Sequence, residues 1–293
     1  MKSKFGLFLM TEKGYVSLKY LLDNNLHLNI GFICIGRDNA VQNDFSSEIE
    51  NLCRCHKLAY YYNSDYNTID RMDYYIAISW RWMLELDNLI VFHDSLLPKY
   101  RGFAPLVNSL INGEKLIGVT ALYASAEYDK GNIIEQQKIE ITYPVKISEA
   151  ITKISLLYGK LLYSLIEKIN SGVTLYGTPQ NESDASYSLW LDEDDYFIDW
   201  SKSATSIKRK VDACGFPFLF AKTYCQSKVI NIVEANTFPD VYVVNREVGK
   251  VIFFNEHNPI VVCGDGLLEI TEAHYNENKE SIFPLKKFRI KFK

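Results

Sequence analysis

The sequence predicts an α/β protein in which a doubly wound, mostly parallel sheet is followed by a smaller, mainly β C-terminal domain. In the first half, short apolar runs rich in Ile, Val and aromatic residues alternate with helical patterns, which is typical of strand–helix–strand units. In the second half, Gly, Asn and Pro break the apolar runs into shorter pieces, as in small β domains. A length of 293 residues also exceeds the usual size of one domain.

Apolar runs with intervening helical patterns define the predicted sheet. The patterns YVSLKYLLDN and SSEIENLCRCHK separate successive runs, so the strands they connect should be parallel. In such a sheet, ligands bind beyond the carboxyl ends of the strands, near a switch in strand order. The predicted strands are KFGLFLM (4–10), LNIGFICIG (28–36), YYIAIS (74–79), NLIVF (88–92) and LIGVTALYA (116–124).

The pattern changes after a long amphipathic segment at 147–169, which we expect to form a helix. The polar, turn-rich stretch that follows is typical of a linker. From about Leu189, one helical segment and several short strands predict a β-rich, barrel-like domain. We therefore expect a first domain at 1–172, a linker at 173–188 and a second domain at 189–293.

Composition excludes several classes of partner. A net charge of -4 gives no field that would attract a polyanion, so a nucleic-acid partner is not expected. No stretch reaches the roughly 20 apolar residues that span a bilayer, and the N-terminal run is too short for a signal sequence. We therefore expect a soluble protein with small-molecule substrates, and the sequence leaves open whether it forms a homodimer.

The six cysteines favour a reducing compartment. They are scattered and lie mostly in apolar runs, as reduced thiols do, rather than in the spacing of a disulfide framework. This pattern indicates a cytoplasmic protein. Cys53, Cys55 and His56 lie close together, but they fall in a helical pattern without a second pair of ligands, so we predict no metal site.

Polar residues of types that can take part in catalysis follow two of the predicted strands. The run NLIVF ends directly in HDSLLPKYRGFAP, which places His93 where a doubly wound sheet presents side chains to a cleft. Pro98 restricts the backbone of the following loop, and Gly102 permits an unusual φ there. Asp129 follows the strand at 116–124 in a second loop. If the two strands are neighbours, a histidine and a carboxylate meet at one edge of the sheet.

Three motifs in this region resemble the N10-formyltetrahydrofolate-dependent formyltransferases. They are HDSLLPKYRG, NGE and GVTALYASAEYDKGNII. The family includes methionyl-tRNA formyltransferase, the glycinamide ribonucleotide enzyme and sugar N-formyltransferases. Two later segments, DWSKSATSIKRKVDACGFPFLFAKTY and VVCGDGLLEI, look like the C-terminal domain of the methionyl-tRNA branch. The resemblance therefore covers nearly the whole chain.

The resemblance implies a Rossmann-like formyltransferase domain that uses N10-formyltetrahydrofolate as co-substrate and no metal. It makes His93 and Asp129 the catalytic pair, which deprotonates an attacking amine and stabilises the tetrahedral oxyanion. It assigns folate contacts to Trp80, Arg81, Trp82, Met83, Ser95, Leu96, Leu97, Pro98 and Tyr128. It assigns acceptor contacts to Lys99, Tyr100, Arg101 and Gly102.

One position departs from the family pattern. The family has an Asn two residues before the histidine, and this chain has Val91, which cannot donate a hydrogen bond to an oxyanion. Loss of such a donor costs about 10²–10³ in rate. Either another group such as Asn132 or Asn108 replaces it, or a protonated His93 suffices, or the enzyme is slow, or the chain is a noncatalytic relative that keeps the folate pocket.

The acceptor is the least determined part of the prediction. Residues 190–293 hold 14 Lys and Arg against 15 Asp and Glu, whereas tRNA affinity depends on neutralising phosphates. We therefore expect a nucleotide-linked amino-deoxy sugar, formylated for surface polysaccharide or glycan synthesis. Formylation of methionyl-tRNA and folate binding without turnover remain the alternatives.

Overall fold

The computed structural model describes residues 3–38, 43–63, 71–285 and 287–293. The chain forms two compact units. The first contains Met1–Leu106, Leu116–Ile141 and Glu149–Leu189, and the second contains Val107–Lys115, Thr142–Ser148 and Trp190–Lys293.

The first unit is built on a seven-stranded sheet with the order β3-β2-β1-β4-β5-β7-β8. The five strands from β3 to β5 are parallel, and β7 and β8 add to this sheet as antiparallel strands. The prediction of a mostly parallel sheet is therefore confirmed. The strands are β1 (Phe5–Leu9), β2 (Ile30–Ile35), β3 (Tyr60–Tyr62), β4 (Tyr74–Ile78), β5 (Leu89–His93), β7 (Leu116–Tyr123) and β8 (Ile133–Glu140).

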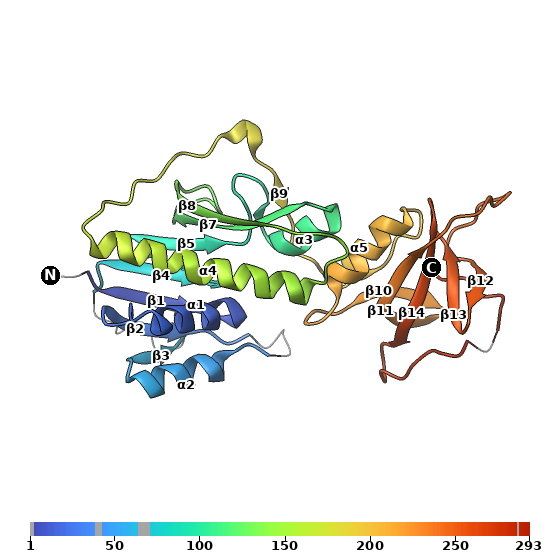
Figure 1. Ribbon diagram of the computed structural model, residues 1–293, viewed down its shortest axis with the longest axis horizontal. Coiled ribbons are helices and arrows are strands. Elements are labelled where there is room, and N and C mark those ends of the chain that lie inside the picture. Colours follow the sequence, from blue (N-terminus) through green and yellow to red (C-terminus); the bar gives the residue numbers. More distant parts are fainter. Residues whose placement is uncertain (1–2, 39–42, 64–70, 286) are drawn as a thin grey trace. The chain divides into compact units, whose positions relative to one another are not determined.

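Three helices cover one face of this sheet (Figure 1). They are α1 (Thr11–Asp23), α2 (Ser46–His56) and α4 (Ile147–Asn170). Side chains alternate between the faces of a strand, and Phe92 of β5 packs its ring 5.5 Å from that of Tyr158 of α4. Phe92 therefore points to the helices, and its neighbours Val91 and His93 point to the other face. A further helix, α3 (Pro105–Asn112), begins in this unit.

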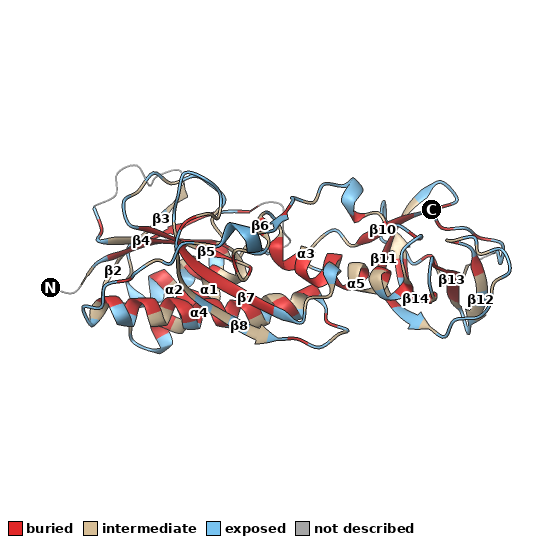
Figure 2. Ribbon diagram, turned by 90° about the horizontal axis from the view of Figure 1, so that it is seen from above, coloured by how far each residue is buried: buried red, intermediate tan, exposed pale blue. Residues whose placement is uncertain are grey.

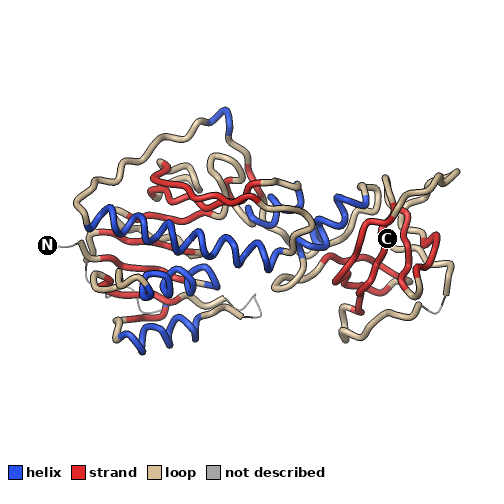
Figure 3. Tube along the Cα trace, in the orientation of Figure 1, coloured by secondary structure: helices blue, strands red, loops and turns tan. Residues whose placement is uncertain are grey.

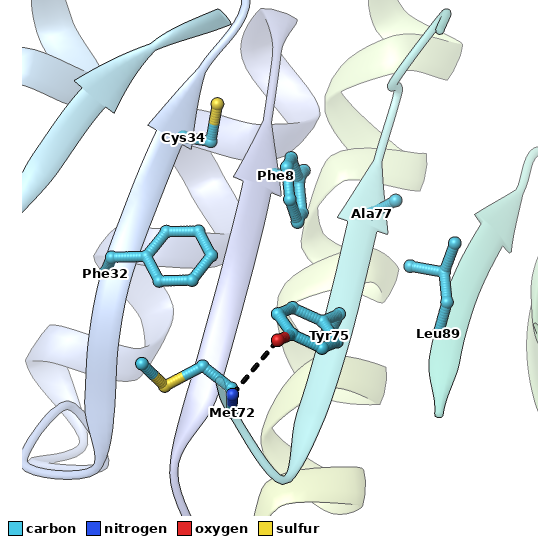
Figure 4. Packing of buried hydrophobic residues seen from close by; sticks show 7 residues of the cluster. All are labelled: Phe8, Phe32, Cys34, Met72, Tyr75, Ala77 and Leu89. Carbon is cyan, nitrogen blue, oxygen red and sulfur yellow. Dashed lines mark hydrogen bonds between the residues drawn. The ribbon is translucent and has the colours of Figure 1, made fainter. Parts of the chain in front are cut away.

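The face away from the helices carries a cluster of buried apolar side chains (Figure 4). Within it, the hydroxyl of Tyr75 accepts a hydrogen bond of 3.0 Å from the backbone N–H of Met72. Residues 79–88, which the structure describes in full, connect β4 to β5 without a helix, and side chains of this loop pack on the cluster. The cluster consists of Phe8, Phe32, Cys34, Met72, Tyr75, Ala77 and Leu89.

The second unit contains a five-stranded antiparallel sheet, one helix directly before that sheet in the chain, and most of α3. The strand order is β10-β11-β14-β13-β12, which confirms a mainly β C-terminal domain. Helix α5 (Ala204–Cys214) is capped by the Ser203 side chain, which accepts from the backbone N–H of Ser206. The strands are β10 (Ala221–Cys225), β11 (Lys228–Phe238), β12 (Val251–Asn255), β13 (Asn258–Val262) and β14 (Leu267–Tyr275).

The polar stretch after α4 runs back along the first unit as a long loop (Figure 3). It contains a short 3-10 helix at Glu182–Asp184 and the two-residue strand β9 (Tyr187–Ser188). Strand β9 pairs in parallel with β6 (Arg101–Gly102). A second 3-10 helix, Asp194–Tyr196, follows in the next unit. Across the described ranges, we find no helix of the length and apolarity that a bilayer crossing requires.

Candidate active site

His93 is the last residue of β5, and its imidazole is buried among polar partners of the first unit. Its exposed fraction is 7%, and much of the sheet to which β5 belongs is buried (Figure 2). Its Nε2 lies 2.8 Å from the carbonyl oxygen of Tyr100, and its Nδ1 lies 3.4 Å from Oδ1 of Asp129. A carbonyl oxygen only accepts hydrogen bonds, so Nε2 carries a proton. In the charged imidazole, both nitrogens would donate to an oxygen.

Asp129 reaches His93 from the loop between β7 and β8. Strand β7 pairs with β5 in the antiparallel direction, and Ala124 at its end donates its backbone N–H to Leu89 at the start of β5. The loop after β7 therefore folds back along β5 to bring Asp129 to His93. The second carboxylate oxygen, Oδ2, accepts a 2.7 Å hydrogen bond from the backbone N–H of Gly102. The loop can close only over a glycine at position 131, because a Cβ there would lie 1.7 Å from the carbonyl oxygen of Tyr123. Gly131 thus lets the loop close, and the contacts with Gly102 and His93 orient the Asp129 carboxylate.

The loop SLLPKYRG after His93 is held by hydrogen bonds within the protein. The Ser95 hydroxyl donates to the Lys99 carbonyl at 2.7 Å. The Thr120 hydroxyl donates to the Ser95 carbonyl at 2.6 Å and accepts from the Leu97 N–H at 3.1 Å. Gln136 donates to the Leu97 carbonyl at 2.9 Å. The polar groups of Ser95 and Leu97 are thus occupied, and the loop is a rigid frame beside His93.

Arg101 holds the returning segment 178–188 against this frame. Its guanidinium is fully buried, and all its N–H groups donate: two to Gln180, two to the Glu182 carboxylate and one to the Tyr187 hydroxyl. The Gln180 amide in turn donates to the backbone oxygens of Asp129 and Gly131 at 2.6 and 2.8 Å. Arg101 therefore supports the Asp129 loop through Gln180.

Gly102 lies at the crossing of the two segments. Its φ is +98°, and a Cβ at this position would lie 2.6 Å from the carbonyl oxygen of Ser188. The glycine lets β6 approach β9 while its N–H still donates to Asp129. The adjacent Tyr100 donates its N–H to the Ser186 hydroxyl, and Lys99 is exposed.

The segment Trp80–Met83, predicted to contact folate, follows the carboxyl end of β4, the parallel neighbour of β5. The Trp80 ring packs edge-on at 5.1 Å from Phe8 and 5.0 Å from Trp82. Arg81 forms an ion pair with Asp38. The side chains of Trp82 and Met83 are exposed by 43% and 63%, so an apolar surface is open to a ligand at this edge.

Tyr128 is an exposed aromatic side chain beside Asp129. Two thirds of it is accessible to solvent, and its ring lies 6.0 Å from that of Phe103, which is also exposed. The two rings flank Gly102 and Asp129 in the chain, so they form an aromatic surface next to the paired side chains. The assignments of single residues to folate or acceptor stay predictions.

Val91 is the residue at which the family pattern has an asparagine. It is partly buried, packs against the apolar cluster and lies between Ala77 and Leu122 of the neighbouring strands. Asn132, a proposed replacement, is exposed at the start of β8, and Asn108 belongs to the second unit. A donor at position 91 would thus stand in an apolar environment.

Two further groups support the site and were not singled out in the sequence. Gln180 lies in a polar stretch without periodicity, which gave no signal. Asp94 follows His93 directly, and a charged residue at the end of a buried strand is a detectable signal. Its carboxylate pairs with Lys13 and accepts from the Tyr158 hydroxyl. Within the described ranges, no set of three or more His, Cys, Asp or Glu is arranged to bind a metal.

The geometry is suited to acid–base chemistry. A histidine at the carboxyl end of β5 and a carboxylate on the β7–β8 loop face each other, and both are mostly buried. Such a pair can move a proton and can stabilise developing negative charge.

Comparison with known proteins gives a consistent picture. A family model described as "Formyl transferase" matches residues 83–162, and one described as "Formyl transferase, C-terminal domain" matches residues 191–282. The first match contains both His93 and Asp129.

Three proteins illustrate the similarity. Methionyl-tRNA formyltransferase from Acetivibrio thermocellus is 32% identical over 187 residues, which are 64% of this chain and 59% of that protein. The bifunctional polymyxin resistance protein ArnA from Wigglesworthia glossinidia brevipalpis is 30% identical over 305 residues, or 95% of this chain and 44% of that protein. The N-formyltransferase from Helicobacter canadensis, solved with folinic acid and dTDP-3-aminofucose, has a TM-score of 0.70 at 17% identity, covering 92% of this chain and 99% of that one.

These similarities differ in what they establish. At 17% identity, the structural likeness shows the fold alone. The chain spans 59% of the length of the methionyl-tRNA formyltransferase and less of ArnA.

Proposed function

Since the chain belongs to the formyl transferase family, we propose that it transfers a formyl group from N10-formyltetrahydrofolate to the amine of a nucleotide-linked amino-deoxy sugar. The observation that carries the proposal is the His93–Asp129 pair, with its carboxylate oriented by the Gly102 N–H. We assign the chemistry to residues 1–172 and place it in the cytoplasm, because all six cysteines are free thiols.

The reaction needs one proton transfer and one stabilised oxyanion. The acceptor amine attacks the formyl carbon, the bond from that carbon to N10 breaks, and the amine proton ends on N10 of tetrahydrofolate. Charged His93 provides positive charge for the oxyanion of the tetrahedral intermediate, and Asp129 receives the amine proton. The Val91 side chain has no hydrogen-bond donor and lies in apolar surroundings, so we assign the stabilisation of the oxyanion mainly to His93.

The surfaces beside the pair suit two flat substrates. The exposed side chains of Trp82 and Met83 follow β4, and a pterin ring can stack on such apolar groups. Phe103 and Tyr128 form a second aromatic surface next to Asp129, and we assign it to the acceptor. The folate and acceptor would then approach the pair from two sides.

A sugar nucleotide is favoured over tRNA by charge. The second unit includes residues 190–293, with 14 basic against 15 acidic side chains, whereas tRNA binding gains most of its free energy from phosphate contacts. The Helicobacter canadensis neighbour was solved with an amino-sugar nucleotide. Formylation of methionyl-tRNA remains the second candidate, because a sequence relative carries that name.

The test is an acceptor screen. Purified protein would be mixed with N10-formyltetrahydrofolate and either nucleotide-linked amino sugars or charged initiator tRNA. Tetrahydrofolate release would be followed by absorbance, and the acceptor's mass gain of one formyl group by mass spectrometry. A formylated amino sugar that is absent with His93→Gln supports the proposal. Product only with tRNA selects the second candidate, and folate binding without any product indicates a noncatalytic relative.

A further inference from the structure

A buried charge network lies directly behind His93. Asp94 accepts a hydrogen bond from the Tyr158 hydroxyl with Oδ1 and pairs with the Lys13 ammonium through Oδ2. The side chains of Lys13 and Asp94 are only 15% and 16% exposed, and Tyr158 is 1% exposed. The Lys13 ammonium also lies 5.9 Å from the centre of the Tyr158 ring. The two partners of Asp94 come from α1 and α4.

The network and the catalytic pair lie on opposite faces of one strand end. His93 points away from the helices, toward Tyr100 and Asp129. Asp94, the next residue, points to the helix-covered face, where α1 and α4 hold it. The peptide between His93 and Asp94 is therefore fixed from both sides by side chains that lie far apart in the sequence.

The charges around His93 are arranged in alternation. Asp129 is on one side, and Asp94 with its Lys13 partner is on the other. Burial favours the neutral form of Asp94, but Lys13, the Tyr158 hydrogen bond and the charge of His93 together hold the pKa of Asp94 below its usual value. Burial, followed by the Asp94 charge, raises the pKa of Tyr158 well above its usual value. Asp94 is therefore an anion, and Tyr158 keeps its proton and donates a hydrogen bond to it.

We infer that Asp94, held by Lys13 and Tyr158, is a positioning residue that fixes His93 from behind and places a negative charge near its imidazole. This role depends on the proposed function for its kinetic consequence, but the titration of His93 can be measured without turnover. Asp94 acts through His93, because it faces the helices and the reacting groups gather on the other face.

The two charges of the network have opposite expected effects. Asp94→Asn removes an anion and leaves Lys13 uncompensated, so charged His93 loses stabilisation and should titrate at lower pH. Lys13→Met leaves the anion without its cation, so His93 should titrate at higher pH. Each shift should be on the order of one pH unit, given charges at this depth. The double variant should return the midpoint close to that of the unchanged protein.

The experiment is an NMR pH titration of the ring protons of the full chain without substrate. The His93 signal is identified by its loss in His93→Gln. Lys19→Met is the matched control, because Lys19 is exposed on the same helix as Lys13, and its midpoint should not move. In formyl transfer, which uses charged His93, the alkaline limb of the kcat profile should follow the same order, with kcat falling about tenfold in Asp94→Asn and KM nearly unchanged.

Two results would overturn the inference: an unchanged His93 midpoint in Asp94→Asn, or shifts of the same sign in both single variants. If a single variant fails to fold because it leaves one buried charge unpaired, the double variant of Lys13→Met and Asp94→Asn still tests the inference, because it removes both charges. If the protein formylates no acceptor but the titration shifts as expected, the proposed function fails and the positioning role stands.

Discussion

Replacing Asp129 by Asn changes the charge of the catalytic pair while keeping its shape. The amide oxygen of Asn can still accept the hydrogen bond from the Gly102 N–H. The full negative charge beside His93 is lost. At the 3.4 Å separation of Nδ1 and Oδ1, the attraction of a charged pair is about 5 kcal/mol for an effective dielectric constant of about 20.

Part of this attraction survives through the amide dipole. We therefore expect a loss of about 3 kcal/mol in transition-state stabilisation, or roughly a hundredfold in kcat, with a small change in KM. Single-turnover release of tetrahydrofolate, with the accepted sugar nucleotide in excess, measures the chemical step. Thermal unfolding provides the fold control.

Asp129→Ala is the informative companion. It removes the charge and also leaves the Gly102 N–H without its acceptor, so it should lower the melting temperature more than Asp129→Asn does. The reasoning is refuted if Asp129→Asn retains more than about half of the wild-type kcat at every pH tested.

Three other perturbations follow from the structure. Arg101→Met should free the segment 178–188, giving faster amide hydrogen exchange there and a kcat loss of roughly tenfold or more, because the Asp129 loop loses its support; protection at the wild-type level would contradict this. Val91→Asn should destabilise the protein by about 1–2 kcal/mol in denaturant titrations without a gain in rate, because the amide enters an apolar cluster; a faster enzyme would show that an oxyanion donor is lacking. The pKa of Asp94 is lowered on folding, so its contribution to stability is present above the unfolded pKa of about 4 and is lost as pH falls through the folded value; Asp94→Asn should flatten the acid arm of the stability profile.

The central strands and the position of His93 could be predicted because burial leaves a strong pattern. Strands such as β1 and β5 are covered on both faces, so they read as continuous apolar runs, and the polar residue that ends β5, His93, marks the edge of the sheet. The strand β8 (Ile133–Glu140) was not predicted. It lies at the end of the sheet, and its burial alternates between partly buried and exposed, which leaves a weaker signal.

The partners of the catalytic pair could be predicted only in part. The neighbourhood of the strands before His93 and Asp129 could be predicted, but β7 runs antiparallel to β5, so the two side chains meet only because the loop after β7 folds back along β5. The contacts of Gln180 depend on how an irregular polar segment returns across the sheet, and no local pattern records that path. The pairing of Lys13 with Asp94 joins residues 81 positions apart; the position of Asp94 after a buried strand is a signal, but nothing local to either residue identifies its partner.

The dependence of Asp129 on the returning segment bears on how the chain can be shortened. A chain truncated after residue 172 would retain every strand of the seven-stranded sheet, together with both His93 and Asp129. It would lack Gln180, Glu182 and Tyr187, and the buried guanidinium of Arg101 would lose all its acceptors. A minimal catalytic fragment must therefore extend at least to Ser188, and during synthesis the pair can settle only after this late segment has emerged.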